Sequence, residues 1–116
     1  MPHIVIEYAH TPSAQQAIDG LLDAVIARVR ESPIIDIDSL KLRATPIHHY
    51  RVGGGHAPFI HTTVALMRGK DARSINELST DLFRTIASHF PDIQQITVDV
   101  REMDPAPYRK RGKEHG

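Results

Sequence analysis

The stretch that decides the fold is the very beginning of the chain, Met1-Pro2-His3-Ile4-Val5-Ile6-Glu7-Tyr8. In an extended chain Ile4, Ile6 and Tyr8 face one way, whereas His3, Val5 and Glu7 face the other, and we predict a β-strand over residues 3–8. The run is short and rich in β-branched residues, as strands are. Removal of Met1 would leave Pro2 with a secondary amine at the end of this strand.

Length and composition indicate one soluble globular domain. The chain has 116 residues, of which 41% are hydrophobic and 24% charged, and this is enough for a single compact core. Basic and acidic residues balance at 14 each, so no net charge favours nucleic acid or an anionic membrane as a partner. The basic run 109–113 is interpreted as a solvated end. We expect neither kind of partner.

Several chemistries and locations are disfavoured by what the sequence lacks. There is no cysteine, so disulfides, cysteine nucleophiles and thiolate metal sites are excluded. The N-terminus shows no signal-peptide pattern, and no run approaches the roughly 18 apolar residues of a membrane span. We therefore expect a cytoplasmic protein.

The first half of the chain has the pattern of a β-α-β unit. Apolar residues at helical spacing predict a helix over residues 12–31, capped by Thr11. A second strand begins near residue 40 and places Lys41 and Arg43 on the same face. Pro46 indicates that this strand lies at an edge or bends there.

The second half repeats this order. Residues 47–52 are predicted as a strand that reaches the turn 53–55 and pairs as a hairpin with a strand over 59–67. Ser74-x-x-Glu77 is a capping-box pattern that would open a second helix, which Pro91 ends. A final strand is predicted over 95–101. Residues 1–104 would form the single domain and 105–116 a mobile tail.

The predicted fold class is α/β: two β-α-β units form one mostly parallel sheet with two helices on one face, a two-layer sandwich. The other face carries alternating residues that are not all polar, among them Val5 and Ala65. A sheet covered on one side only needs a partner for the other, so we expect oligomerisation.

Several segments resemble the tautomerase superfamily, and within it the 5-carboxymethyl-2-hydroxymuconate isomerase family. The opening Met-Pro-His followed by an apolar strand and Glu7 is typical of that family. The segment from Gly55-His56 to Phe59-Ile60-His61-Thr62-Thr63 is similar to its Gly-x-His…Phe-Val-His-x-Thr pattern. Arg73-Ser74 and the helix ending in His89-Phe90 also match, so the resemblance spans about residues 2–101.

This resemblance implies a tautomerase-like homotrimer that isomerises unsaturated keto or enol carboxylic acids, such as 5-carboxymethyl-2-hydroxymuconate, in the catabolism of aromatic compounds. It implies no cofactor, with Pro2 acting as general base and acid after Met1 is removed. The family holds substrate carboxylates with two arginines. One matches Arg73; the other aligns with Lys41, two residues before Arg43, and a lysine lacks the planar fork that pairs both carboxylate oxygens.

The chemistry needs a base that is neutral near pH 7 and then returns the proton. An α-amino group has a pKa of roughly 7.7–8.0 in a model peptide, and nearby cations or an apolar pocket lower that pKa. The same cations at positions 41, 43 and 73 would attract an anionic substrate and stabilise its dienolate. These three residues are the candidate substrate-binding groups beside Pro2.

Two alternatives stay open from the sequence. One is a non-catalytic trimeric relative that binds a small ligand or a protein on the same scaffold. The other is a metal enzyme built from histidines, four of which lie at positions 48, 49, 56 and 61. No His-x-x-x-His pair falls on a predicted helix, and we expect no metal site. The glycines at 53–55 lack the Lys-Ser/Thr of a phosphate loop and are interpreted as a turn.

Overall fold

The computed structural model describes residues 2–112. The first strand, β1, spans His3–Ala9 and has the predicted alternation: Ile4, Ile6 and Tyr8 are buried, whereas Glu7 is exposed. Each fully buried aliphatic side chain of this kind stabilises the fold by about 1.5–3 kcal/mol relative to an exposed one. The opening segment therefore anchors the sheet through a single apolar face.

The first helix, α1, spans Pro12–Val29 and ends two residues before the predicted boundary. Its N-cap is Thr11, as predicted, and the Thr11 hydroxyl oxygen accepts a hydrogen bond from the Ala14 N–H at 3.1 Å. Pro12 fits the first turn because its missing N–H would have no intrahelical partner there. The helix buries one stripe of five residues: Ala14, Ile18, Leu21, Val25 and Val29.

The second strand, β2, spans Lys41–Ile47 after a short 3₁₀ turn at Ile37–Ser39. It runs parallel to β1, with Lys41 beside His3 and Ile47 beside Ala9. Pro46 lies within β2, and β2 is an edge strand. The prediction of an edge strand is confirmed, because a proline can replace a strand residue whose N–H would point away from the sheet.

The predicted hairpin between residues 47–52 and 59–67 is wrong. The third strand, β3, spans Phe59–Met67 and pairs antiparallel with β1, so β1 separates it from β2. Within the loop 48–58, only an isolated bridge between Val52 and Gly55 closes the glycine turn. The apolar β1 is buried and takes a neighbour on each edge, whereas the glycine turn only folds back on itself. His48 and His49 consequently lie in a loop rather than in the predicted strand 47–52.

The second helix, α2, spans Ala72–His89 and begins before the predicted capping box. Its N-cap is Asp71, whose Oδ1 accepts from the Ser74 N–H at 3.1 Å and whose Oδ2 accepts from the Ser74 hydroxyl at 2.6 Å. Ser74 is thus the third helical residue, and the predicted role of Ser74 as cap is wrong. A carboxylate four positions upstream of Ile75 satisfies the first-turn N–H groups instead.

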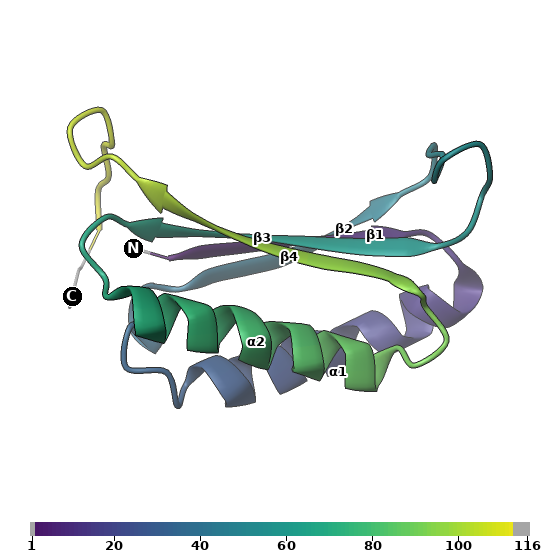
Figure 1. Ribbon diagram of the computed structural model, residues 1–116, viewed down its shortest axis with the longest axis horizontal. Helices are drawn as coiled ribbons and strands as arrows, with labels where there is room; N and C mark the ends of the chain where they lie inside the picture. The colour runs from purple at the N-terminus through teal and green to yellow at the C-terminus, as the bar shows by residue number, and fades with distance from the viewer. Residues whose placement is uncertain (1, 113–116) are drawn as a thin grey trace.

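The last strand, β4, spans Gln95–Met103 and runs parallel to β3. Within residues 2–112 the strand order is β2-β1-β3-β4, with parallel pairs at both edges and an antiparallel pair in the centre. Figure 1 shows both helices beneath one face of the sheet. The predicted mostly parallel α/β sandwich is confirmed. The core lies between these two layers, and none of the helices in the described part of the chain is long and apolar enough to cross a membrane.

The other face of the sheet is not covered by a helix and is called the open face below. Strand register places Val5 there between Arg43 and Thr63, and His3 between Lys41 and Ala65. Figure 1 shows the loop between β2 and β3 and the tail after β4 rising on this side at opposite ends of the sheet. The predicted mobile tail 105–116 includes residues 113–116, which lie outside the described residues.

Candidate active site

Pro2 lies directly before β1 and is buried in the chain. Its carbonyl oxygen accepts a hydrogen bond from the Lys41 backbone N–H at 3.0 Å. This bond extends the parallel pairing of β1 and β2 by one residue, so the end of the strand is held in register. Met1, on whose removal the amine of Pro2 depends, lies outside the described residues.

Lys41 is the first residue of β2 and lies beside His3. Its Nζ donates to the Ser39 carbonyl oxygen at 3.0 Å. The ammonium therefore bends back towards the turn that precedes β2. Lys41 thus contacts Pro2 through its backbone N–H, while one of the three donors of its ammonium group is used within its own strand connection.

Arg43 projects from the same face of β2 and contacts His3. Arg43 Nη1 lies 3.3 Å from His3 Nδ1, and His3 Nε2 lies 3.0 Å from the Tyr108 hydroxyl. Burial, followed by the charges of Arg43 and Lys41, lowers the pKa of His3 below its usual value of 6.5. The imidazole is therefore held in its neutral form between a cation and a phenol.

Arg73 occupies the first turn of α2, and Figure 1 shows that this turn lies at the same end of the molecule as the beginning of β1. Its side chain is 89% exposed, and its Nε pairs with Glu77 Oε1 at 3.2 Å. Glu77 supplies the anion that a cation at a helix N-terminus needs. The structure thus joins Pro2 to Lys41 through a backbone hydrogen bond and places Arg43 against His3, the next residue of β1. Arg73 lies on the helix layer, where its partner is Glu77.

Sequence reasoning missed His3 and Tyr108 as members of this group. Strand alternation had already placed His3 on the face of Lys41 and Arg43 once β1 and β2 were paired. Tyr108 gave only a weak signal, since it is a lone aromatic residue in a polar tail. Their contact joins residues 105 positions apart, and local sequence patterns do not reach that far.

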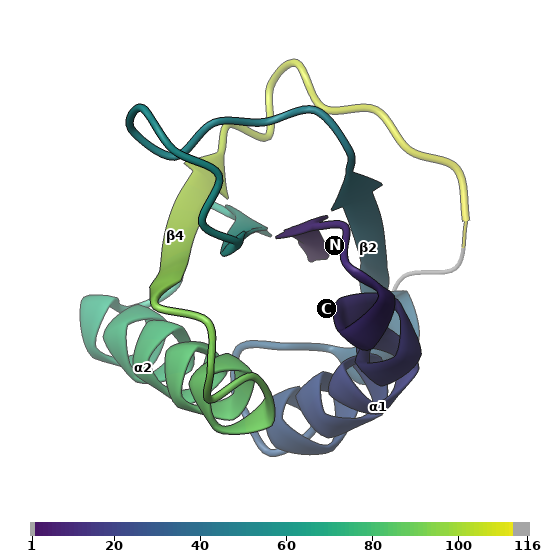
Figure 2. The ribbon, with the colours of Figure 1, turned by 90° about the vertical axis from the view of Figure 1, so that its right-hand side faces the viewer.

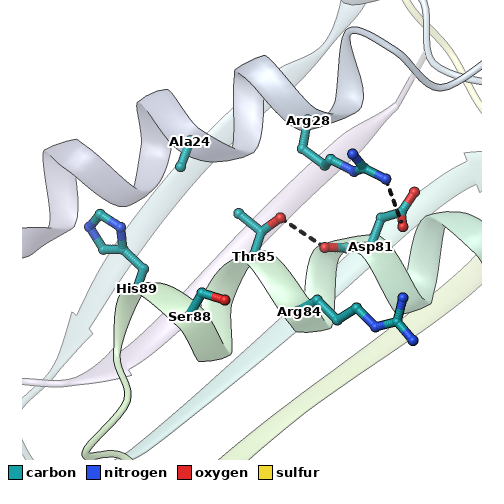
Figure 3. A pocket seen from close by; sticks show the side chains of 7 residues that line it. All are labelled: Ala24, Arg28, Asp81, Arg84, Thr85, Ser88 and His89. Atoms are coloured by element: carbon teal, nitrogen blue, oxygen red, sulfur yellow. Dashed lines mark hydrogen bonds and ion pairs between the residues drawn. The ribbon is translucent and has the colours of Figure 1, made fainter.

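A separate hollow of about 490 Å³ lies between α1 and α2, on the outer side of the helix layer (Figure 3). Its polar groups are mostly engaged with one another: Arg28 Nη2 pairs with Asp81 Oδ1 at 3.0 Å, and the Thr85 hydroxyl donates to the Asp81 carbonyl at 2.8 Å. His89 Nε2 lies 3.1 Å from the Ala17 carbonyl oxygen. None of the lining residues is a predicted site residue, so we do not place the active site there.

The histidines do not gather into a metal centre in the described part of the chain. Within residues 2–112 no group of three or more His, Asp or Glu side chains is arranged to hold a metal ion. His48 instead stacks on His10 with ring centroids 4.4 Å apart, and His61 contacts the Thr97 hydroxyl at 2.6 Å.

The model of the 5-carboxymethyl-2-hydroxymuconate isomerase family matches residues 2–115. The chain belongs to this family. It is therefore an isomerase, as the resemblance of its opening segment implied. No curated protein sequence matches this isomerase significantly.

Solved structures share the fold of this isomerase at low sequence identity. Pt0534 inactivated by 2-oxo-3-pentynoate is 20% identical, with a TM-score of 0.78 over 95% of this chain and 93% of that one. A 5-carboxymethyl-2-hydroxymuconate isomerase from Deinococcus radiodurans R1 is 19% identical, with a TM-score of 0.76 over 97% and 90%. A fused 4-OT symmetric trimer is 21% identical, with a TM-score of 0.68 over 89% and 85%.

Proposed function

We propose that this isomerase uses the amine of Pro2, freed by removal of Met1, as general base and acid. The substrate class is an unsaturated keto or enol carboxylic acid such as 5-carboxymethyl-2-hydroxymuconate. The observation that carries the proposal is the placement of Pro2 at the buried start of β1, hydrogen-bonded to Lys41 and one strand position from the contact between His3 and Arg43.

The proposed reaction moves one proton and no electrons. The neutral amine takes a proton from one end of the conjugated system, which leaves a dienolate and a pyrrolidinium ion. The pyrrolidinium ion then returns the proton to another carbon of the same system, and the amine is regenerated. The chemistry is internal to the amine and the substrate, so the proposal includes no cofactor.

The cations have two functions in this proposal. Lys41 and Arg43 stabilise negative charge as it develops on the dienolate oxygen or as it arrives on a substrate carboxylate. They also disfavour the charged form of a neighbouring amine and thus keep it available as a base. Arg73 is proposed as a second carboxylate-binding group, for which it would exchange its exposed ion pair with Glu77 for the substrate.

A homotrimer is proposed as the working state. The fused 4-OT relatives are trimers by description, and the open face of this sheet carries half-buried apolar side chains at Val5 and Ala65. A second or third copy would cover this face, which the helices leave exposed.

The decisive experiment combines intact-mass measurement with an ultraviolet assay on 5-carboxymethyl-2-hydroxymuconate. We expect the mass of the chain without Met1, and we expect that a variant with an added N-terminal residue loses activity by about 10²–10⁴-fold, the usual contribution of a positioned base. Pro12→Ala is the matched control, because Pro12 lies at the exposed start of α1.

Full activity in a variant that retains a residue before Pro2 would exclude the amine mechanism. A native protein that keeps Met1 and converts no substrate would instead favour the alternative, a trimeric small-ligand or protein-binding relative on the same scaffold.

A further inference from the structure

A hydrogen-bonded chain runs from the C-terminal tail to the candidate carboxylate-binding arginine. The Tyr108 hydroxyl contacts His3 Nε2 at 3.0 Å, and His3 Nδ1 contacts Arg43 Nη1 at 3.3 Å. We propose that Tyr108 and His3 are positioning residues, which together hold the Arg43 guanidinium in place for a substrate carboxylate. This proposal rests on the function proposed above.

The donor and acceptor in each of these two hydrogen bonds follow from the groups involved. An arginine guanidinium has only N–H donors, so it donates to His3 Nδ1, which must be unprotonated. A neutral imidazole then carries its proton on Nε2 and donates it to the Tyr108 oxygen. Tyr108 therefore stabilises the one neutral tautomer of His3 that is able to accept a hydrogen bond from Arg43.

The groups that surround His3 favour its neutral imidazole form. Lys41 and Arg43 of β2 present cations, Ala65 of β3 presents only a methyl group, and Tyr108 presents a hydroxyl group and a ring edge. The rings of His3 and Tyr108 lie 6.4 Å apart at 66°. No carboxylate among the described residues hydrogen-bonds to His3, so nothing in this environment favours the imidazolium ion.

Hydrogen bonds and an ion pair within the described part of the tail hold Tyr108 beside His3. Asp104 accepts from the Ala106 N–H at 3.0 Å and pairs with Arg68 at 2.9 Å. Arg109 Nη1 donates to the Ala106 carbonyl at 2.7 Å. These bonds form a turn just after β4. Figure 2 shows the tail running from the β4 side towards the β2 side, and Figure 1 places it at the end of the sheet where β1 begins.

The two cations of β2, Lys41 and Arg43, therefore have different roles. Lys41 donates back to Ser39, whereas Arg43 uses one N–H for His3 and keeps its remaining donors for a planar two-oxygen contact. The geometry points to Arg43 as the residue that recognises the carboxylate, with Lys41 acting through its charge.

The first test observes His3 directly by nitrogen-15 NMR of the imidazole. In the wild-type protein at pH 8 we expect an unprotonated Nδ1 and a protonated Nε2. Tyr108→Phe removes only the hydroxyl group and should shift the ring towards a mixture of tautomers. Tyr50→Phe is the matched control, because its ring packs on Phe59 away from His3. A wild-type ring protonated on Nδ1, or an unchanged ring in Tyr108→Phe, would overturn the proposal.

The second test is kinetic. Tyr108→Phe should raise KM about fivefold with little change in kcat, since losing one neutral hydrogen bond weakens ground-state and transition-state binding alike. His3→Asn places an amide oxygen near the position of Nδ1 and should keep KM lower than His3→Leu does. Equal KM values for these two His3 variants would contradict the positioning role.

The two proposals fail in different ways. A wild-type protein that isomerises none of the substrates tested would refute the amine mechanism. The NMR experiment would still identify the tautomer of His3. An active wild-type protein with identical KM values and His3 spectra in Tyr108→Phe would leave the amine mechanism intact and refute the inference about the tail.

Discussion

His3 titrates in surroundings that disfavour its charged form. Burial is the largest cause, and Arg43 and then Lys41 add electrostatic repulsion, so the pKa of His3 lies below 6.5. The unfolded chain takes up a proton at His3 near pH 6.5, whereas the folded chain takes it up only at lower pH. Folding stability from this residue is therefore complete above pH 6.5 and falls as the pH drops towards the lowered pKa.

Removing the charge of Arg43 should reverse part, but not all, of the lowering of the His3 pKa. We expect a titration midpoint below 6.5 in the wild-type protein. In Arg43→Met the midpoint should rise but stay below 6.5, because burial acts before charge as the cause of the shift. Proton NMR of the His3 ring measures both midpoints, and Arg84→Met, on the exposed face of α2, is the control expected to change nothing. A wild-type midpoint at or above 6.5 would contradict the environment described here.

Single residues of the site differ in how far sequence predicts them. Alternation along β2 was sufficient to place Lys41 and Arg43 on one face, because the period of a strand is a local property. The partner of Arg73 is Glu77, one helical turn away, and it was hidden by the assignment of Glu77 to a capping box. The contact between His3 and Tyr108 depends on the path of the whole chain. The catalytic and binding roles of Pro2, Lys41, Arg43 and Arg73 stay predictions.

Elements with one buried face were predicted well, and their boundaries and partners less well. Both helices and the strand faces follow the apolar period, which reflects burial against a single layer. The start of α2 was missed because Asp71 competes with Ser74 as the cap and adds a turn. The hairpin was predicted wrongly because strand pairing is decided by β1, which lies far away in the sequence and takes β3 as its second neighbour.

Helices α1 and α2 meet at Gly20, where a side chain would be obstructed. A Cβ atom at Gly20 would lie 3.2 Å from His89 Nε2, the atom that contacts the Ala17 carbonyl. Gly20→Ala alone should therefore gain less than the roughly 1 kcal/mol that alanine usually adds in a helix. With His89→Ala in the background, the same substitution should recover that gain.

Urea denaturation of the two single variants and the double variant measures this coupling as a double-mutant cycle. An additive result, with the full gain in both backgrounds, would show that His89 does not oppose a side chain at position 20.

At the scale of the whole molecule, the sheet is covered by helices on one face only (Figure 1). Val5 lies on the open face beside Arg43 and Thr63. If three copies meet through this face, a lysine at position 5 would bury a cation next to Arg43 without a partner, and such burial is strongly unfavourable. The open face is thus the place where oligomerisation is most sensitive to charge.

We expect light scattering to give the wild-type protein a mass three times that of one chain. We expect the Val5→Lys variant to dissociate towards single chains. Ala27→Lys is the matched control, because Ala27 is exposed on α1; it should leave the mass unchanged. A Val5→Lys protein that keeps the wild-type mass would place the interface elsewhere.

The antiparallel pairing of β1 with β3 makes the two ends of the sheet different, because only one of them carries the start of β1. Each of these strands is followed by a helix and a parallel strand, so the two halves point in opposite directions along the sheet. β1 starts at His3 and β3 starts at Phe59, so these two starts lie at opposite ends of the sheet. If the amine of Pro2 is the base, as proposed, the loop 48–58 at the opposite end of the sheet is able to change in length without disturbing it.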